Sequence, residues 1–160
     1  MEIFYKLIEV AVTLIEDTII ISSVVAISGR RYAIKKHILC VLAAVAAMSL
    51  AVSGLNRIEM FSFITPIFGM LIVLLISRLL SSGSLLLRAT ACVTTFFVIQ
   101  SIDYILFIGM GLLHGNPNET FATFMSPGTL RNLYLFLNKV TDIVVFFLLR
   151  KDLHKLSSFR

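Results

Sequence analysis

Five ionisable side chains lie inside stretches of sequence that are otherwise apolar. They are Glu16, Asp17, Asp103, Lys139 and Asp142. On insertion scales, each would cost roughly 2.5–3.5 kcal/mol at the centre of a membrane helix before any partner is counted. Charged or polar partners on neighbouring helices would offset that cost. We therefore expect these side chains to form an intramembrane polar network.

Lys139 is the one cation of this set, against four acids. A rise of about 1.5 Å per residue places Lys139, Asp142 and Asp103 about 12–16 Å below the outer ends of their helices. Glu16 lies about 20 Å below the outer end of its helix, and long side chains can bridge the difference in depth. Because Glu16 and Asp17 differ by about 100° around their helix, they cannot both face one partner. We expect Glu16 to reach Lys139, and Asp17 to hydrogen-bond elsewhere or to be protonated, since burial disfavours a charged carboxylate.

Three roles are open to such a network. The charges could only fix the register and packing of the helices. They could form a proton or ion pathway, which also uses buried carboxylates. They could form a polar switch with two arrangements, which a bound ligand would bias.

Other chemistry has little support in the sequence. His37 and Cys40 share a helical face, but no orienting carboxylate or oxyanion-stabilising motif accompanies them, as a cysteine nucleophile would need. The sequence has no glycine-rich phosphate loop and no metal-ligand motif. We expect no enzyme activity, no metal, no cofactor and no nucleic-acid partner.

The composition predicts an integral protein of the cell membrane. The chain is 58% hydrophobic and only 14% charged, whereas soluble domains are about 45–50% apolar and about 25% charged. The first apolar run extends from Ile3 to about Ile27 without a preceding basic segment or a cleavage site, so it is not read as a signal peptide.

The hydropathy pattern predicts an all-α, polytopic bundle of five membrane-spanning helices, since about 20 helical residues cross a bilayer. The predicted spans are 3–28, 38–55, 60–80, 89–113 and 132–149. Together they make one transmembrane domain over residues 1–150, followed by a short basic tail over 151–160.

The distribution of basic residues predicts the orientation. Ten of the 14 lysines and arginines fall in or directly beside the connection 29–37, the connection after the third span and the C-terminal tail. Cytoplasmic segments carry the excess of Lys and Arg. The N-terminus is therefore expected outside the cell and the C-terminus in the cytoplasm.

Two local patterns leave alternatives open. Thr65 and Pro66 could start the third helix as its N-cap and first residue, or Pro66 could kink a helix that starts near Met60. Ala43, Ala47 and Ala51 form a stripe of small residues, which lets helices approach closely. This stripe could pack inside the bundle or between subunits.

The outer connection 114–131 is predicted to contain a short amphipathic helix. Pro117 suits its first turn, and Pro127 with Gly128 would end it. Phe121, Phe124 and Met125 would share one face of this helix. The face could anchor the loop in the interface or form the lid of an outward-facing ligand pocket.

Three segments together resemble the N-terminal transmembrane sensor domains of AgrC-type GHKL histidine kinases. They are "IEVAVTLIEDTIII" in the first helix, the basic turn "GRRYAIKKH", and "LRNLYLFLNKVTDIVVFFLLRK" in the last helix. Glu16 and Lys139 are the positions that carry the resemblance. It covers nearly the whole chain and rests on the hydropathy layout and a few polar positions.

The resemblance implies a receptor of a two-component, quorum-sensing-like system. Such a domain senses an extracellular small ligand or peptide and relays the signal through its last helix to a dimeric cytoplasmic kinase. No kinase domain is present in this chain, so a homodimer or pairing with a kinase-bearing homologue is expected. Two other classes are open: a small transport component, either a substrate-binding subunit or a proton-coupled carrier, and a membrane accessory protein.

Overall fold

The computed structural model describes residues 2–55, 65–114 and 128–158, and these fold into helices. The helices are α1 (Glu2–Ser28), α2 (Ile34–Leu55), α4 (Thr65–Leu80), α5 (Leu85–His114) and α7 (Thr129–Ser158). No β-strand occurs in these ranges. The predicted all-α fold class is confirmed.

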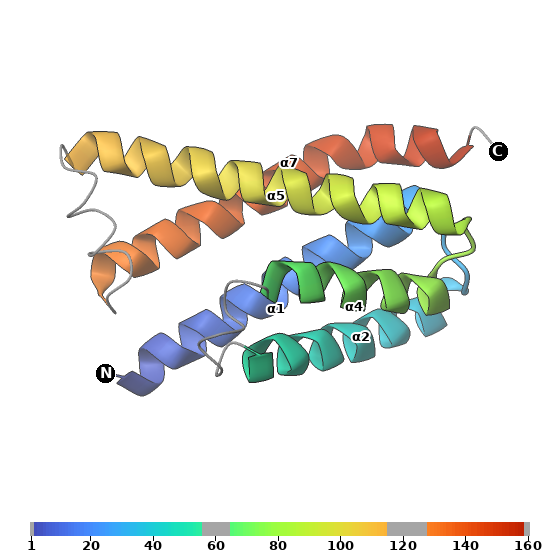
Figure 1. Cartoon of the computed structure of the whole chain (residues 1–160), viewed down its shortest axis with the longest axis horizontal. Coiled ribbons are helices and arrows are strands. Elements are labelled where there is room, and N and C mark those ends of the chain that lie inside the picture. Colours follow the sequence, from blue (N-terminus) through green and yellow to red (C-terminus); the bar gives the residue numbers. More distant parts are fainter. Residues whose placement is uncertain (1, 56–64, 115–127, 159–160) are drawn as a thin grey trace.

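The helices run up and down in an elongated bundle (Figure 1). The α1–α2 connection, the α4–α5 connection and the C-terminal end of α7 lie at the same end, and the N-terminus lies at the other (Figure 1). α1 packs against each of the other four described helices, most extensively against α7. Residues of α1 are therefore placed to meet side chains from every part of the bundle.

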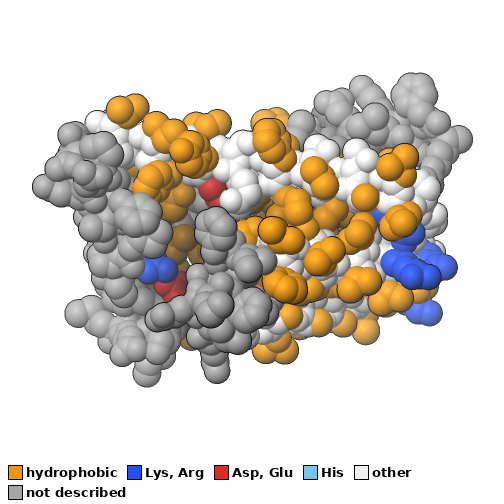
Figure 2. Space-filling view, in the orientation of Figure 1, with side chains coloured by type: hydrophobic (Ala, Val, Ile, Leu, Met, Phe, Trp, Pro, Cys, Tyr) orange, Lys and Arg blue, Asp and Glu red, His pale blue; other side chains and the backbone are white. Residues whose placement is uncertain are grey.

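Apolar side chains occupy both the interior and the outside of the bundle. Ile20, Ile21 and Val24 of α1 are buried together with Val73 of α4. Large apolar side chains such as Leu86 are also exposed, and they cover much of the middle of the face seen in Figure 2. An apolar outer surface of this extent suits lipid rather than water.

Among the described helices, three contain segments long and apolar enough to cross a membrane. These segments are Leu7–Ser28, Ile34–Val52 and Leu85–Leu113. α4 contributes a shorter apolar stretch, Pro66–Leu80. These helices indicate a membrane protein.

The two connections at the basic end of the bundle pair with each other. The backbone N–H of Arg31 donates to the carbonyl of Leu80 at 3.1 Å, and the N–H of Ser82 donates to that of Gly29 at 3.0 Å. Gly29 has a φ of 81°, which a residue without a Cβ adopts readily. This pairing ties the α1–α2 turn to the α4–α5 turn.

The helix limits differ from the predicted spans in identifiable ways. α2 begins at Ile34 and α5 at Leu85, each four residues before the predicted span. α2 continues through a polar first turn that holds Lys35 and Lys36, whereas α5 includes three leucines, 85–87, that precede Arg88. The described part of α4 begins at Thr65. Residues 56–64 lie outside the described part, so both alternatives for the start of this helix stay predictions. α7 continues to Ser158, into the segment expected as a tail.

The alanine stripe does not pack inside the bundle as a unit. Ala43 and Ala47 are exposed, and only Ala51 is partly buried. The inward face of α2 carries Val45 and Met48 instead. The alternative in which the stripe packs inside the bundle is therefore wrong for Ala43 and Ala47. Because the larger apolar side chains of α2 face the interior, these two alanines lie on the outside of the helix.

Candidate polar site

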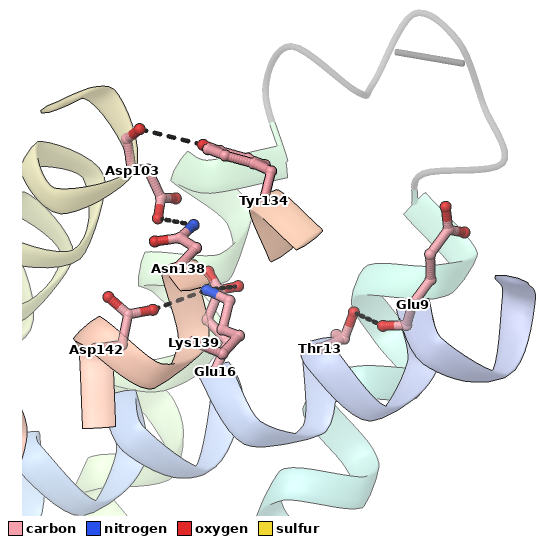
Figure 3. A network of polar contacts seen from close by, with 8 residues as sticks. All are labelled: Glu9, Thr13, Glu16, Asp103, Tyr134, Asn138, Lys139 and Asp142. Carbon is pink, nitrogen blue, oxygen red and sulfur yellow. Dashed lines mark hydrogen bonds and ion pairs between the residues drawn. The ribbon is translucent and has the colours of Figure 1, made fainter. Parts of the chain in front are cut away.

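Lys139 lies at the centre of a buried cluster that joins α7 to α1. Its Nζ is 2.9 Å from Glu16 Oε2 and 2.8 Å from Asp142 Oδ2 (Figure 3). The side chain of Lys139 is 6% exposed and that of Asp142 is 0% exposed, while Glu16 retains 30%. The structure thus contains the pair expected from the sequence, Glu16 with Lys139.

The helices position this cluster by two simple relations. Lys139 and Asp142 are three residues apart on α7, so they share a face of that helix. α1 packs along the same face, and Glu16 reaches across the contact between the two helices. A lysine with two carboxylate partners keeps its charge satisfied in surroundings where an unpaired charge would be costly.

Asp103 of α5 joins the site through an amide rather than through the lysine. Asn138 Nδ2 donates to Asp103 Oδ1, and Tyr134 Oη donates to the backbone carbonyl of Asp103 at 3.1 Å (Figure 3). The sequence reasoning missed Asn138 and Tyr134. A usable signal was present, since Asn138 is a polar residue beside Lys139 in the middle of an apolar span.

Asp17 belongs to a separate contact. It is buried, and it accepts a hydrogen bond from Ser49 Oγ of α2. The expectation that Asp17 turns away from Lys139 to another hydrogen-bond partner agrees with this geometry. The five predicted ionisable residues therefore form two groups: the cluster on α1, α5 and α7, and the Asp17–Ser49 bond between α1 and α2.

A second ion pair joins α1 to α7 nearer the N-terminal ends of these two helices. Arg131 Nη2 lies 2.6 Å from Glu9 Oε1, with side chains 28% and 44% exposed, respectively. Glu9 and Glu16 are seven residues apart on α1, about 10 Å along the helix axis. Two ion pairs therefore connect the same two helices, and we call this contact the α1–α7 seam.

The cluster contains more acceptors than donors. Asp142 Oδ1 and Asn138 Oδ1 are buried and have no hydrogen-bond partner among the described residues. Within the same ranges, no group of three or more His, Cys, Asp or Glu side chains is placed to hold a metal ion. The chemistry open to this site is charge pairing, hydrogen bonding and binding of a cationic group.

Phe121, Phe124 and Met125, the predicted face of the outer loop, lie outside the described residues, as does the rest of 115–127. Their role on the ligand side stays a prediction.

No family model matches the chain, and no curated protein and no solved structure is significantly similar to it. The resemblance to AgrC-type sensor domains therefore stays a prediction from the sequence.

Proposed function

We propose that this chain is a receptor domain of the cell membrane. In this proposal five helices span the bilayer, with the N-terminus outside and the C-terminus in the cytoplasm. The receptor detects an extracellular small ligand or peptide and passes the signal to a cytoplasmic partner through α7, as a sensor of a two-component system does. Its partner would be a second copy or a kinase-bearing homologue.

The arrangement of charges at the ends of the bundle supports this topology. Arg30, Arg31, Lys35 and Arg78 are exposed. The first two lie in the α1–α2 connection, Lys35 lies in the first turn of α2, and Arg78 lies in the last turn of α4, next to the connections that pair with each other. Figure 2 shows Lys and Arg side chains gathered at that end of the molecule. Cytoplasmic ends of membrane helices carry such an excess of basic residues.

The α1–α7 seam is the observation that carries the receptor proposal. Its outer pair, Glu9–Arg131, lies toward the N-terminal ends of α1 and α7, which the proposed topology places outside the cell, where an extracellular ligand would arrive. Its inner pair, Glu16–Lys139, lies farther along both helices, and Lys139 is buried there. A ligand that competes for Glu9 or Arg131 would favour a different position of α7 relative to α1. Because α7 is one continuous helix, the change in position would extend to its cytoplasmic end. Such a ligand shifts the equilibrium only if its affinity differs between the two positions of α7.

The test measures whether an extracellular peptide changes the seam. The full chain is reconstituted in nanodiscs with spin labels at the exposed positions Val10 and Leu133, on α1 and α7. The peptide fraction of spent medium from the source organism is then compared with the same fraction of fresh medium. We expect a change in the label-to-label distance that Lys139→Met abolishes while the protein stays folded. An unchanged distance, or a full response in Lys139→Met, would contradict the proposal.

Topology is tested separately by labelling single cysteines. In a background with Cys40→Ser and Cys92→Ser, Ser82→Cys should react with a membrane-impermeant maleimide only after the cells are opened. Asn118→Cys should react in intact cells. Uptake of a substrate into vesicles that contain only this chain would favour a transport component instead.

A further inference from the structure

Asp142 is the one member of the lysine cluster with a free oxygen that also lines a cavity. The residue is only 2% exposed, and Lys139 Nζ donates a hydrogen bond to its Oδ2 at 2.8 Å. Its Oδ1 is buried and has no hydrogen-bond partner among the described residues. In Figure 3 this second oxygen points away from Lys139. A buried carboxylate oxygen without a donor is costly, so a ligand that brings a donor would be stabilised there.

The charge of the cluster favours a cationic donor. Lys139 supplies one positive charge, and Glu16 and Asp142 together supply two negative ones when ionised. A charge that stays unpaired inside a bundle is more costly than a pair. A second cation beside Asp142 would balance the cluster, and a neutral hydroxyl would not.

The cavity determines what kind of cation fits. It has a volume of about 60 Å³, is partly open to the outside, and lies between α1, α5 and α7. Most of its lining is aliphatic or aromatic, including Ile19, Ile99 and Phe146, with hydroxyl groups from Ser23 and Thr95. This volume exceeds the roughly 10–15 Å³ that one water needs. An alkali cation would find few oxygen ligands in it, whereas an ammonium group on an alkyl chain matches both the carboxylate and the apolar wall.

The exposed rim gives such a molecule a way in. Thr94 lines the cavity and is exposed on the outside of α5, next to the exposed apolar side chains of Val93 and Phe97. The surface around the mouth is therefore suited to acyl chains, where amphiphiles concentrate.

We propose that this cavity binds a primary alkylammonium amphiphile, with its ammonium group on Asp142 Oδ1 and its alkyl chain leaving between α5 and α7. The ammonium would donate to Oδ1, and the hydroxyl groups of Ser23 and Thr95 would be its nearest additional acceptors. The inference goes beyond the receptor function and does not depend on it, because the site is a property of the bundle itself.

The experiment uses the full chain in phosphatidylcholine nanodiscs and a diazirine-bearing octylamine as the probe. We expect saturable photolabelling that maps to the segments around residues 19–27, 94–102 and 142–146. Octylamine should compete at least tenfold better than octanol, which has the same chain without the charge. Asp142→Asn keeps an acceptor for Lys139 and should lower labelling at least tenfold.

A second pair of variants covers the case in which Asp142→Asn fails to fold. Thr95→Leu fills the cavity while leaving Asp142 intact, and it should also abolish labelling. Thr141→Leu makes the same substitution one residue from Asp142, where the hydroxyl bonds only to Leu137 of its own helix, and should label like the wild type. Three results would each overturn the proposal. They are competition by octanol equal to that by octylamine, competition by sodium chloride at constant ionic strength, and full labelling of Thr95→Leu. Because no signalling partner is needed, failure here is distinct from failure of the receptor function.

Discussion

Lys139 of α7 lies 2.9 Å from Glu16 of α1, and this ion pair joins two helices at opposite ends of the chain. The same lysine holds Asp142 at 2.8 Å on its own helix. One cation therefore serves two carboxylates in the interior of the bundle. Removing it would leave both acids without a charged partner.

Lys139→Met should therefore lower the free energy of unfolding by about 3 kcal/mol. Glu16→Gln should cost less, since Lys139 keeps Asp142. The double variant Glu16→Gln/Lys139→Met should be less destabilised than the sum of the two single variants, because fewer unpaired charges remain. Unfolding in mixed micelles of increasing dodecyl sulfate content measures all three. Strict additivity of the two substitutions would mean that the pair does not interact.

Ser49→Ala removes the hydroxyl that donates to the buried carboxyl of Asp17. We expect a loss of about 1–3 kcal/mol of stability, the cost of a buried acceptor left without its donor. Ser101→Ala is the matched control, because its hydroxyl bonds only to the carbonyl of Phe97 in its own helix, at 2.7 Å. The control should change stability by less than about 0.5 kcal/mol. Equal losses of stability in the two variants would show that the hydrogen bond from Ser49 to Asp17 contributes no more than a bond within one helix.

Gly83→Ala should disturb the connection between α4 and α5. A Cβ at this position would lie 2.5 Å from the carbonyl oxygen of Ser28, a backbone atom that cannot rotate away. Overpacking of this kind costs about 1–3 kcal/mol. Gly109→Ala is the control, because a Cβ there meets nothing within 4 Å, and the change should gain up to about 1 kcal/mol of helix propensity. Thermal unfolding of both variants in one detergent compares them, and a neutral Gly83→Ala would show that the two connections are not in contact.

The Glu9–Arg131 ion pair should contribute much less to stability than the Glu16–Lys139 pair. Glu9 and Arg131 are 44% and 28% exposed, and partly solvated pairs contribute about 0–1 kcal/mol. A double-mutant cycle with Glu9→Gln and Arg131→Gln should give a coupling within that range. Raising the salt concentration should reduce this coupling more than the coupling of Glu16 with Lys139, because exposed charges are screened more strongly. A coupling that salt leaves unchanged would contradict this view of the outer pair.

Much of the fold could be predicted because it depends on local patterns. Apolar runs of helical length predict helices, and the order of those runs along the chain predicts an all-α bundle. The limits were less accurate at Ile34 and Leu85. At Ile34 the helix continues past its apolar segment into polar residues, and at Leu85 it continues past Arg88 into three further leucines. The exposure of Ala43 and Ala47 was not predictable from their spacing. The rotation of a helix about its axis depends on which neighbouring helices cover it.

The sequence by itself determined the class of fold and one contact of the site. A single lysine among the apolar spans needs a carboxylate at a similar depth, and Glu16 met that requirement. The tertiary structure decided the other partners: Asp103 bonds to Asn138, Asp17 bonds to Ser49, and Glu9 pairs with Arg131. It also decided that Asp142 borders a cavity. These relations depend on the rotation of each helix and on which helices are neighbours, and packing of the whole bundle sets both.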